Sequence, residues 1–323
     1  MKQTTWEVNG WLASLKPLWL MAVCTCAVVM HAGAVQARET GSGVVQSCTD
    51  TQWSKSALLQ LANDQFELAS AEQPAMIERL ALCLKEDDPQ LRDAIGFSGL
   101  SQLLRSEVVD QASIRRLYLQ LSSDVAAAKN NRSGVYLPFA VLVLSELARV
   151  DRKQPYLSDA ERTQLVALAA TQMQTITDYR GFDEVVGWRH QVAHSADLLL
   201  QLILNQALDG KSVQTLVNAI DGQISPAGHS YIFGEPERLA RPVLYAMMRQ
   251  DVPESFWREK LTLWAKPSHI DSWEQAFTST QGLAQRHNRS AFLSQLMLPA
   301  STSTNPALQA LAPLVAQALK QVP

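Results

Sequence analysis

The chain consists of one helical pattern after another, separated by short polar or proline-containing breaks, with no convincing strand. The expected helices lie near 53–70, 73–86, 89–105, 109–128, 134–150, 158–178, 188–207, 212–223, 236–250, 254–265, 271–285, 289–298 and 305–321. Serial helices of this length with short turns are typical of helix-pair repeat proteins and of α/α rings. The sequence therefore predicts an all-α fold, either a HEAT-like superhelix of helical pairs or an α/α ring, with no fixed sequence repeat.

Some of these segments carry the residues that begin helices. Ser158 is followed three residues later by Glu161, which is the pattern of a capping box. Pro236 stands where a first-turn proline is tolerated, because the missing N–H would have no partner there. Pro242 comes more than one turn later and is expected to kink the helix. These signals support helices that begin close to Ser158 and Pro236.

The first 37 residues have the pattern of an export signal. Lys2 and Lys16 precede an uncharged apolar run at 18–30, and small residues follow as far as Ala37. This order is typical of a secretory signal peptide, and the run is shorter than the ~20 residues that a membrane-spanning helix needs. We therefore expect cleavage after Ala37, a periplasmic or secreted location, and no stable membrane insertion of the mature chain. An uncleaved anchor is the alternative.

Residues 38–52 are small and polar, so we expect a flexible lead-in before a single all-α domain at 53–323. Removal of the signal peptide at 1–37 leaves two cysteines, Cys48 and Cys83. An even number of cysteines in an oxidising compartment indicates a disulfide, although two buried free thiols would also fit. A bridge closing this loop would stabilise the fold by roughly 3–4 kcal/mol through chain entropy.

The charge pattern excludes some partners. The formal net charge is −3, and the 28 Lys and Arg residues are scattered along the chain. A nucleic-acid-binding domain normally shows a basic stripe, and attraction to anionic lipid needs a polybasic patch. Neither pattern is present, so we expect no nucleic-acid partner. Nothing in the sequence suggests a nucleotide, flavin or haem.

The most unusual expected helix lies near 188–207 and carries a narrow polar stripe on an otherwise apolar surface. At about 100° per residue, five polar side chains fall within one sector of this helix. They are His190, His194, Asp197, Gln201 and Asn205. A solvated helix face normally carries Lys, Arg or Glu, and this stripe has none, which indicates a groove or cavity wall. A solvent-facing or purely structural stripe is the alternative.

The chemistry of the stripe leaves two possibilities open. His190 is expected in the first turn, where the helix dipole favours the neutral imidazole that a ligand or a hydrogen-bond relay to Asp197 would need. Two histidines at i and i+4 can also share a metal, as in the zinc-protease pattern His-Glu-x-x-His. Gln191 stands where that mechanism needs its glutamate base, which argues against such a protease. His190, His194 and Asp197 are thus candidates for a divalent metal, and a metal-free His–Asp network is favoured.

The loop just before the stripe supplies further candidates for ligand binding. Residues 179–184 combine aromatic, basic and acidic side chains, including Arg180, as loops that line sites often do. Trp188 follows as an aromatic surface for stacking. An ordinary interhelical turn is the alternative. Ser195 is no nucleophile candidate, because it is turned away from the stripe and lacks a Gly-x-Ser-x-Gly elbow.

A second cluster follows later in the chain. It contains Tyr231 and Glu235, then Arg238 and Arg241 on one helix face. Arginine presents a planar fork that suits carboxylates. These arginines could therefore pair with Asp197 or Glu235, or bind an acidic ligand. A structural ion pair is the alternative.

Part of the stripe helix resembles a known family signature. Residues 187–199 run Gly-Trp-Arg-His-Gln-Val-Ala-His-Ser-Ala-Asp-Leu-Leu, similar to the Gly-Trp-x-His-x-x-Ala-His-Gly-Ala-Asp core of bacterial domain-of-unknown-function family 2785. Residues 234–240 resemble its second motif, and Ser195 replaces the usual glycine. The likeness covers roughly 75–300 and implies an α-helical, HEAT-like fold without an established activity. It also implies one site formed by Trp188, His190, His194, Asp197, Glu235 and Arg238.

Three kinds of function remain open at this point. The first is a binding protein whose groove holds a small polar or saccharide-like ligand, with Trp188 and Tyr231 stacking on it. The second is a cell-envelope hydrolase or lyase that uses His190, Asp197 and Glu235, with or without a metal. The third is a helical-repeat scaffold that binds other proteins. The one-site hypothesis requires that Glu235 reaches the stripe.

Overall fold

The computed structural model describes residues 47–323, and the export signal expected at 1–37 lies outside the described residues. Almost all regular structure in the described range is helical, which confirms the predicted all-α fold. The described residues belong to one compact unit. Within them, no helix has the length and apolar character that crossing a bilayer requires.

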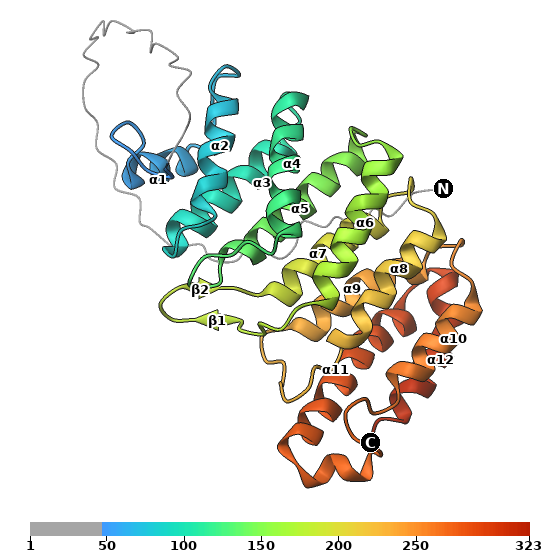
Figure 1. Ribbon diagram of the computed structural model, residues 1–323. Coiled ribbons are helices and arrows are strands. Elements are labelled where there is room, and N and C mark those ends of the chain that lie inside the picture. Colours follow the sequence, from blue (N-terminus) through green and yellow to red (C-terminus); the bar gives the residue numbers. More distant parts are fainter. Residues whose placement is uncertain (1–46) are drawn as a thin grey trace, which may run out of the picture. The chain divides into compact units, whose positions relative to one another are not determined.

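The helices follow one another along the chain with short connections (Figure 1). They are α1 Lys55–Asn63, α2 Gln73–Cys83, α3 Ser98–Arg105, α4 Gln111–Ala126, α5 Tyr136–Lys153, α6 Asp159–Gln174, α7 Gln191–Ile203, α8 Gly210–Ile220, α9 Glu235–Met247, α10 Glu254–Trp264, α11 Thr280–Thr302 and α12 Pro306–Lys320. A π-helical segment, Gln90–Phe97, precedes α3, and 3-10 turns lie at Asp221–Gln223 and Glu274–Thr278.

Two departures from the expected helices matter for the site. The helix expected near 188–207 begins only at Gln191, because the residues before it form a small antiparallel ribbon. Its strands are β1, Phe182–Asp183, and β2, Gly187–Trp188. The remaining starting signals act as expected, since the capping box of α6 is formed and α9 begins with a first-turn proline. α9 also continues through Pro242.

The helices pack in two series that alternate along the chain. In one series α5 packs on α7, α7 on α9, and α9 on α11. In the other, α2 packs on α4, α4 on α6, and α6 on α8. Within each series, successive members therefore lie two places apart along the chain, which is the arrangement expected for helical pairs.

The helices α5, α7 and α9 run in the same direction. His194 in the first turn of α7 contacts the carbonyl of Pro138 in the first turn of α5. Arg152 near the end of α5 reaches Gln201 near the end of α7. Arg249, just past α9, donates to the carbonyl of the last residue of α7. Side chains at corresponding heights of the three helices therefore meet.

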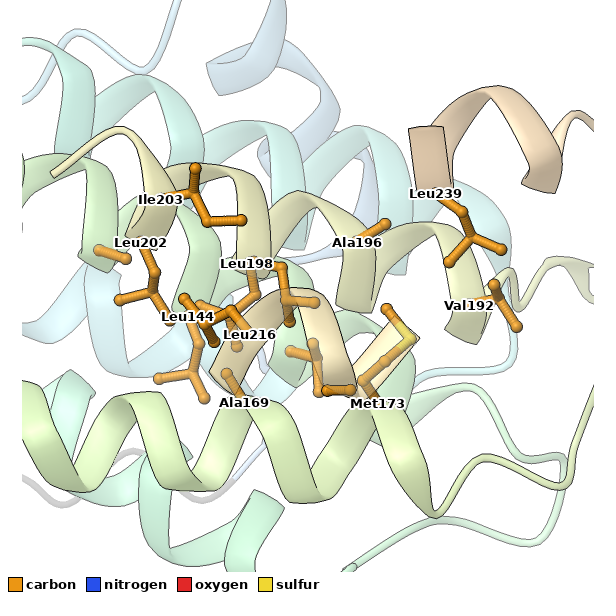
Figure 2. Close-up of a cluster of buried hydrophobic side chains, with 14 of the residues drawn as sticks. Leu144, Ala169, Met173, Val192, Ala196, Leu198, Leu202, Ile203, Leu216 and Leu239 are labelled. Carbon is orange, nitrogen blue, oxygen red and sulfur yellow. The ribbon is translucent and has the colours of Figure 1, made fainter. Parts of the chain in front are cut away.

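Burial of its apolar side chains fixes the rotation of α7. These side chains pack against α5, α6, α8 and α9 in one continuous cluster (Figure 2). Val192, Ala196, Leu198, Leu202 and Ile203 come from α7 itself and are almost completely buried. Since burying one leucine or isoleucine side chain contributes about 1.5–3 kcal/mol, rotating α7 would be costly. The polar stripe is consequently held at the line where α5 and α9 flank the helix.

The start of the described chain is docked rather than free. Cys48 is buried and forms a disulfide with Cys83 at the end of α2, with the two Cα atoms 4.7 Å apart. Arg79 of α2 donates to the carbonyls of Ser47 and Cys48, at 3.1 Å each, and pairs with Asp50. The described end of the expected lead-in, residues 47–52, is thus attached to the helical domain.

Candidate functional site

The ribbon before α7 is fixed by neighbouring elements and determines where Trp188 and His190 lie. Asp183 accepts hydrogen bonds from the backbone amides of Val185 and Val186. The buried Arg92 donates to the carbonyl of Val186, at 2.7 Å. Gly187 has a φ of +70°, in the region that favours glycine. The chain therefore enters α7 from a rigid turn.

His190 occupies an unusual backbone conformation at the N-cap of α7. Its φ of +55° and ψ of 40° are left-handed, which is uncommon for a residue other than glycine. Such strain concentrates at functional sites. Its ring is stacked on the Trp188 indole, with centroids 4.8 Å apart and planes at 22°. Nε2 is shielded from solvent, has no hydrogen-bond partner, and lies 4.0 Å from Oε1 of Glu235.

The His190 imidazole is neutral at physiological pH. Burial lowers its pKa to about 4, and the positive charge of Arg238 contributes in the same direction. The sequence predicts the neutral form from the helix dipole, whereas burial is the main cause in the structure. Glu235 is 2% exposed and accepts a hydrogen bond from the backbone N–H of Phe233, at 2.9 Å. A neutral ring and a carboxyl group thus face each other across a small gap.

His194 is the deepest histidine of the stripe. Its Nδ1 lies 3.2 Å from the carbonyl oxygen of Pro138, so this nitrogen carries the proton and donates. Burial lowers the pKa of His194 well below its usual value, and the nearby His190 imidazole and the positive charge of Arg238 disfavour its protonation further. The edge of the ring packs against Phe139 at 5.1 Å. His194 is therefore a neutral residue anchored to α5.

Asp197 forms a two-pronged ion pair with Arg238 of α9. Nε of Arg238 lies 3.2 Å from Oδ1 of Asp197, and the Nη2–Oδ2 contact is closer still. Burial raises the pKa of Asp197, against the opposing effects of Arg238 and Arg241. Both Asp197 oxygens are therefore engaged. This pair joins the two motifs, so the structure brings Glu235 and Arg238 to the stripe as the one-site hypothesis requires.

The last two residues of the stripe have different roles. Gln201 accepts a hydrogen bond from Arg152 of α5, at 3.2 Å, and remains partly exposed. Asn205 is buried, donates to Asp151 at 3.1 Å and accepts from the Ala207 backbone amide. Asn205 therefore terminates α7 structurally, while Gln201 links α7 to α5 and is only partly buried.

An aromatic rim surrounds Trp188. Trp188 itself is 37% exposed and contacts the rings of Phe182, at 5.1 Å, and Phe233, at 5.8 Å. Phe182 is half-exposed, and Ile232 beside Phe233 is largely exposed. The sequence points to Trp188 but not to Phe233, whose proximity to the ribbon arises only in the fold.

An open depression of about 440 Å³ adjoins this rim and shares Phe182 and Phe233 with it. The other lining residues are Thr177, Asp178, Tyr179, Arg180, Gly181, Asp183, Arg189 and His229. Arg180 lies here, but its guanidinium is already paired with Asp178. His229 stacks on Tyr179 at 5.1 Å and has a shielded, unpartnered Nε2. His229 begins the second cluster of the sequence, but it is not among the site residues predicted there.

Two expected contributions do not fit the structure. Tyr231 is 2% exposed, and its hydroxyl donates to the carbonyl of Gln223, at 2.8 Å. It belongs to the core and cannot stack on a ligand, contrary to the expectation. The candidate metal ligands also fail to converge, because within residues 47–323 no group of at least three His, Cys, Asp or Glu side chains could hold a metal ion. Nδ1 of His194 and both oxygens of Asp197 already have partners.

Comparison with known proteins places the chain in a family. A family model described as "Protein of unknown function (DUF2785)" matches residues 125–298, which include α5, α7, α9 and all candidate residues on them. No curated protein and no solved structure matches the chain. The matched segment covers more than half of the sequence and contains both motifs on which the resemblance depends. The chain therefore belongs to the DUF2785 family.

Proposed function

We propose that this protein binds a small polar, saccharide-like ligand at the N-terminal end of α7, against Trp188 and His190. The observation that carries the proposal is the state of His190. Its imidazole is neutral, its Nε2 is buried without a hydrogen-bond partner, and its backbone is held in a left-handed conformation. Buried polar atoms in proteins nearly always have partners, so a missing partner supports the presence of a ligand.

The surroundings of His190 suit a ligand with both polar and apolar faces. Trp188 and Phe182 offer partly exposed aromatic surface, on which the C–H face of a sugar ring can pack. Glu235 adds a hydrogen-bonding group close to His190. Asp197 and Arg238 neutralise each other. A neutral polar ligand therefore fits the inner part of this site better than a strongly charged one.

Ligand screening with matched variants tests the proposal. Purified protein is screened with mono- and oligosaccharides by thermal shift, since a ligand that binds only the folded state raises the melting temperature. We expect His190→Gln and Trp188→Ala to abolish the shift caused by the ligand found. His269→Gln and Phe277→Ala alter exposed residues outside the site, and they should retain the shift. A ligand whose shift survives in both site variants would contradict the proposal.

A second candidate function is acid–base catalysis on such a ligand. The specific observation is the 4.0 Å separation between Nε2 of His190 and Oε1 of Glu235, both largely buried. Proton transfer by a positioned pair of this kind is a common catalytic device. A mechanism with two free carboxyl groups is less favoured, because Arg238 engages Asp197. Glu235→Gln separates the two functions, since it would abolish turnover of a bound glycan while the glycan still binds.

The proposed location is outside the cytoplasm. The proposal depends on the signal-like pattern of residues 1–37, and the Cys48–Cys83 disulfide supports it because disulfides persist in oxidising compartments. Fractionation of cells that express the full chain would test it, with processing after Ala37 checked by intact mass. A cytoplasmic, unprocessed protein would contradict it.

A further inference from the structure

Near the C-terminal end of α7, a guanidinium group of α5 has no carboxylate partner among residues 47–323. Arg152 of α5 donates from Nη2 to Oε1 of Gln201 on α7, at 3.2 Å. Its Nε is shielded from solvent and has no hydrogen-bond partner. A partly buried cation is costly unless an anion compensates for it.

Arg149 adds a second positive charge on the same side of α5. It stands one helical turn before Arg152, so the two side chains are neighbours. Burial lowers the pKa of Arg152, and the charge of Arg149 lowers it further. Arg149 also lines a small hollow with Glu107 and Lys153 at the edge of α5. The two guanidinium groups therefore repel each other near the C-terminal end of α5.

Arg241 brings a third positive charge from the opposite side, on α9. It follows Arg238, the partner of Asp197, by one turn of α9, just as Gln201 follows Asp197 by one turn of α7, so Arg241 and Gln201 lie at the same height. Tyr245, one turn after Arg241, lies close enough to Arg152 to influence the pKa of its guanidinium group. The faces of α5 and α9 that carry these arginines are thus turned toward the same stretch of α7.

The carboxylates near this stretch are already paired. Glu146 of α5 accepts two hydrogen bonds from Arg105 of α3. Asp197 accepts two from Arg238. These pairs neutralise their own charges. Arg149, Arg152 and Arg241 therefore remain as excess positive charge on α5 and α9.

We propose that Arg152 and Arg241, together with Gln201, bind an oxyanion, the carboxylate or phosphate group of a ligand, between α5, α7 and α9. The planar fork of arginine matches two oxygens of such a group. The free Nε of Arg152 and its Nη groups supply this fork, and the Gln201 amide offers a neutral donor beside it. Arg149 strengthens the positive potential from the edge. This site is separate from the Trp188–His190 end and does not depend on the function proposed there.

Calorimetric titration with defined anions tests the site. The full processed chain is titrated with inorganic phosphate and, separately, with succinate, at one ionic strength balanced with sodium chloride. We expect saturable binding of at least one anion. Because a hydrogen bond to a charged group is worth ~1.5–3 kcal/mol, Arg152→Gln and Arg241→Gln should each weaken this binding by roughly 10- to 100-fold.

Arg132→Gln is the matched control, since it removes the same charge from an exposed position. It should leave the dissociation constant unchanged. Circular dichroism shows whether each variant is folded, and Arg152→Lys, which keeps the charge but loses the fork, replaces Arg152→Gln if that variant unfolds. Preference for phosphate or for succinate identifies the oxyanion. The proposal is overturned if neither anion shows saturable binding, or if Arg132→Gln weakens binding as much as Arg152→Gln and Arg241→Gln do.

The two proposals fail separately. If no saccharide needs His190 but phosphate binding needs Arg152, only the oxyanion site stands. If a saccharide needs His190 but neither anion binds at Arg152, only the Trp188–His190 site stands. A ligand whose affinity falls in both His190→Gln and Arg152→Gln would contact both sites.

Discussion

The two ends of α7 carry similar polar residues and use them in opposite ways. At the C-terminal end, Asn205 belongs to a closed network in which Asp151 accepts five hydrogen bonds, from Asn205, Arg162 and two backbone amides. At the N-terminal end, His190 has a left-handed backbone and a buried nitrogen without a partner. Fully satisfied buried networks stabilise a fold, whereas unsatisfied groups mark sites with another purpose. The comparison therefore separates a fully hydrogen-bonded end of α7 from an end that retains a buried nitrogen without a partner among the described residues.

The largest expected effect is the loss of the closed network. Asp151→Ala removes a carboxylate that is 2% exposed and leaves Arg162 buried without its main partner. Breaking such a pair typically costs about 3–5 kcal/mol, which urea unfolding would measure. Asp159→Ala, which removes the exposed partner of the same arginine, should change stability little. Equal losses in the two variants would show that the Asp151 network has no special role.

A smaller effect is expected from protonation at the N-terminal end of α7. His190 has a folded pKa of about 4, below the value near 6.5 of an unfolded histidine. The unfolded state therefore binds more protons between pH 6.5 and 4, and stability falls as the pH is lowered through this window, by up to about 3 kcal/mol. His194 acts in the same direction. The measurement is the unfolding free energy from pH 7.5 to 4.5.

The contribution of His190 is the difference between wild-type and His190→Asn profiles over that range. His269→Gln, at an exposed position, should reproduce the wild-type profile. If the unfolding free energy of His190→Asn changes with pH as that of the wild type does over the whole range, His190 is not buried in neutral form.

The smallest effect is expected from the same substitution at neutral pH. Asparagine tolerates the left-handed conformation of position 190 better than most residues. His190→Asn should therefore change the unfolding free energy by less than about 1 kcal/mol, as a residue that serves binding rather than stability would. Chemical denaturation measures this directly. A loss comparable to that of Asp151→Ala would remove the distinction between the two ends of α7.

Helical periodicity was sufficient to predict the stripe. The apolar residues of α7 determine which side is buried, so the sector that holds His194 and Asp197 follows from sequence alone, whereas His190 precedes the helix. The complementarity of Asp197 and Arg238 was also visible as one option, because arginine suits carboxylates. The actual pairing required knowledge that α7 and α9 are neighbours, which no local pattern contains.

Other features of the site depend on tertiary contacts that sequence spacing does not encode. Tyr231 lies close to Glu235 along the chain, yet its hydroxyl is directed to Gln223 in the core. His190 adopts its left-handed conformation because the ribbon before it turns the chain into α7. Arg152 was likewise not selected from the sequence, since only the fold places it beside Gln201.

The common direction of α5, α7 and α9 has an electrical consequence. Peptide dipoles that point the same way add. The electrostatic potential of the three helices is therefore positive at their N-terminal ends, where Pro138 and Glu235 lie, and negative at their C-terminal ends. The buried carboxyl group of Glu235 is placed at the favourable pole. The side chains of Arg149 and Arg152 reverse the sign at the unfavourable one. A molecule lying along α7 would thus meet positive potential at the Arg149–Arg152 end and a carboxyl group stabilised by the helix dipoles at the other end, with the neutral Asp197–Arg238 pair between them.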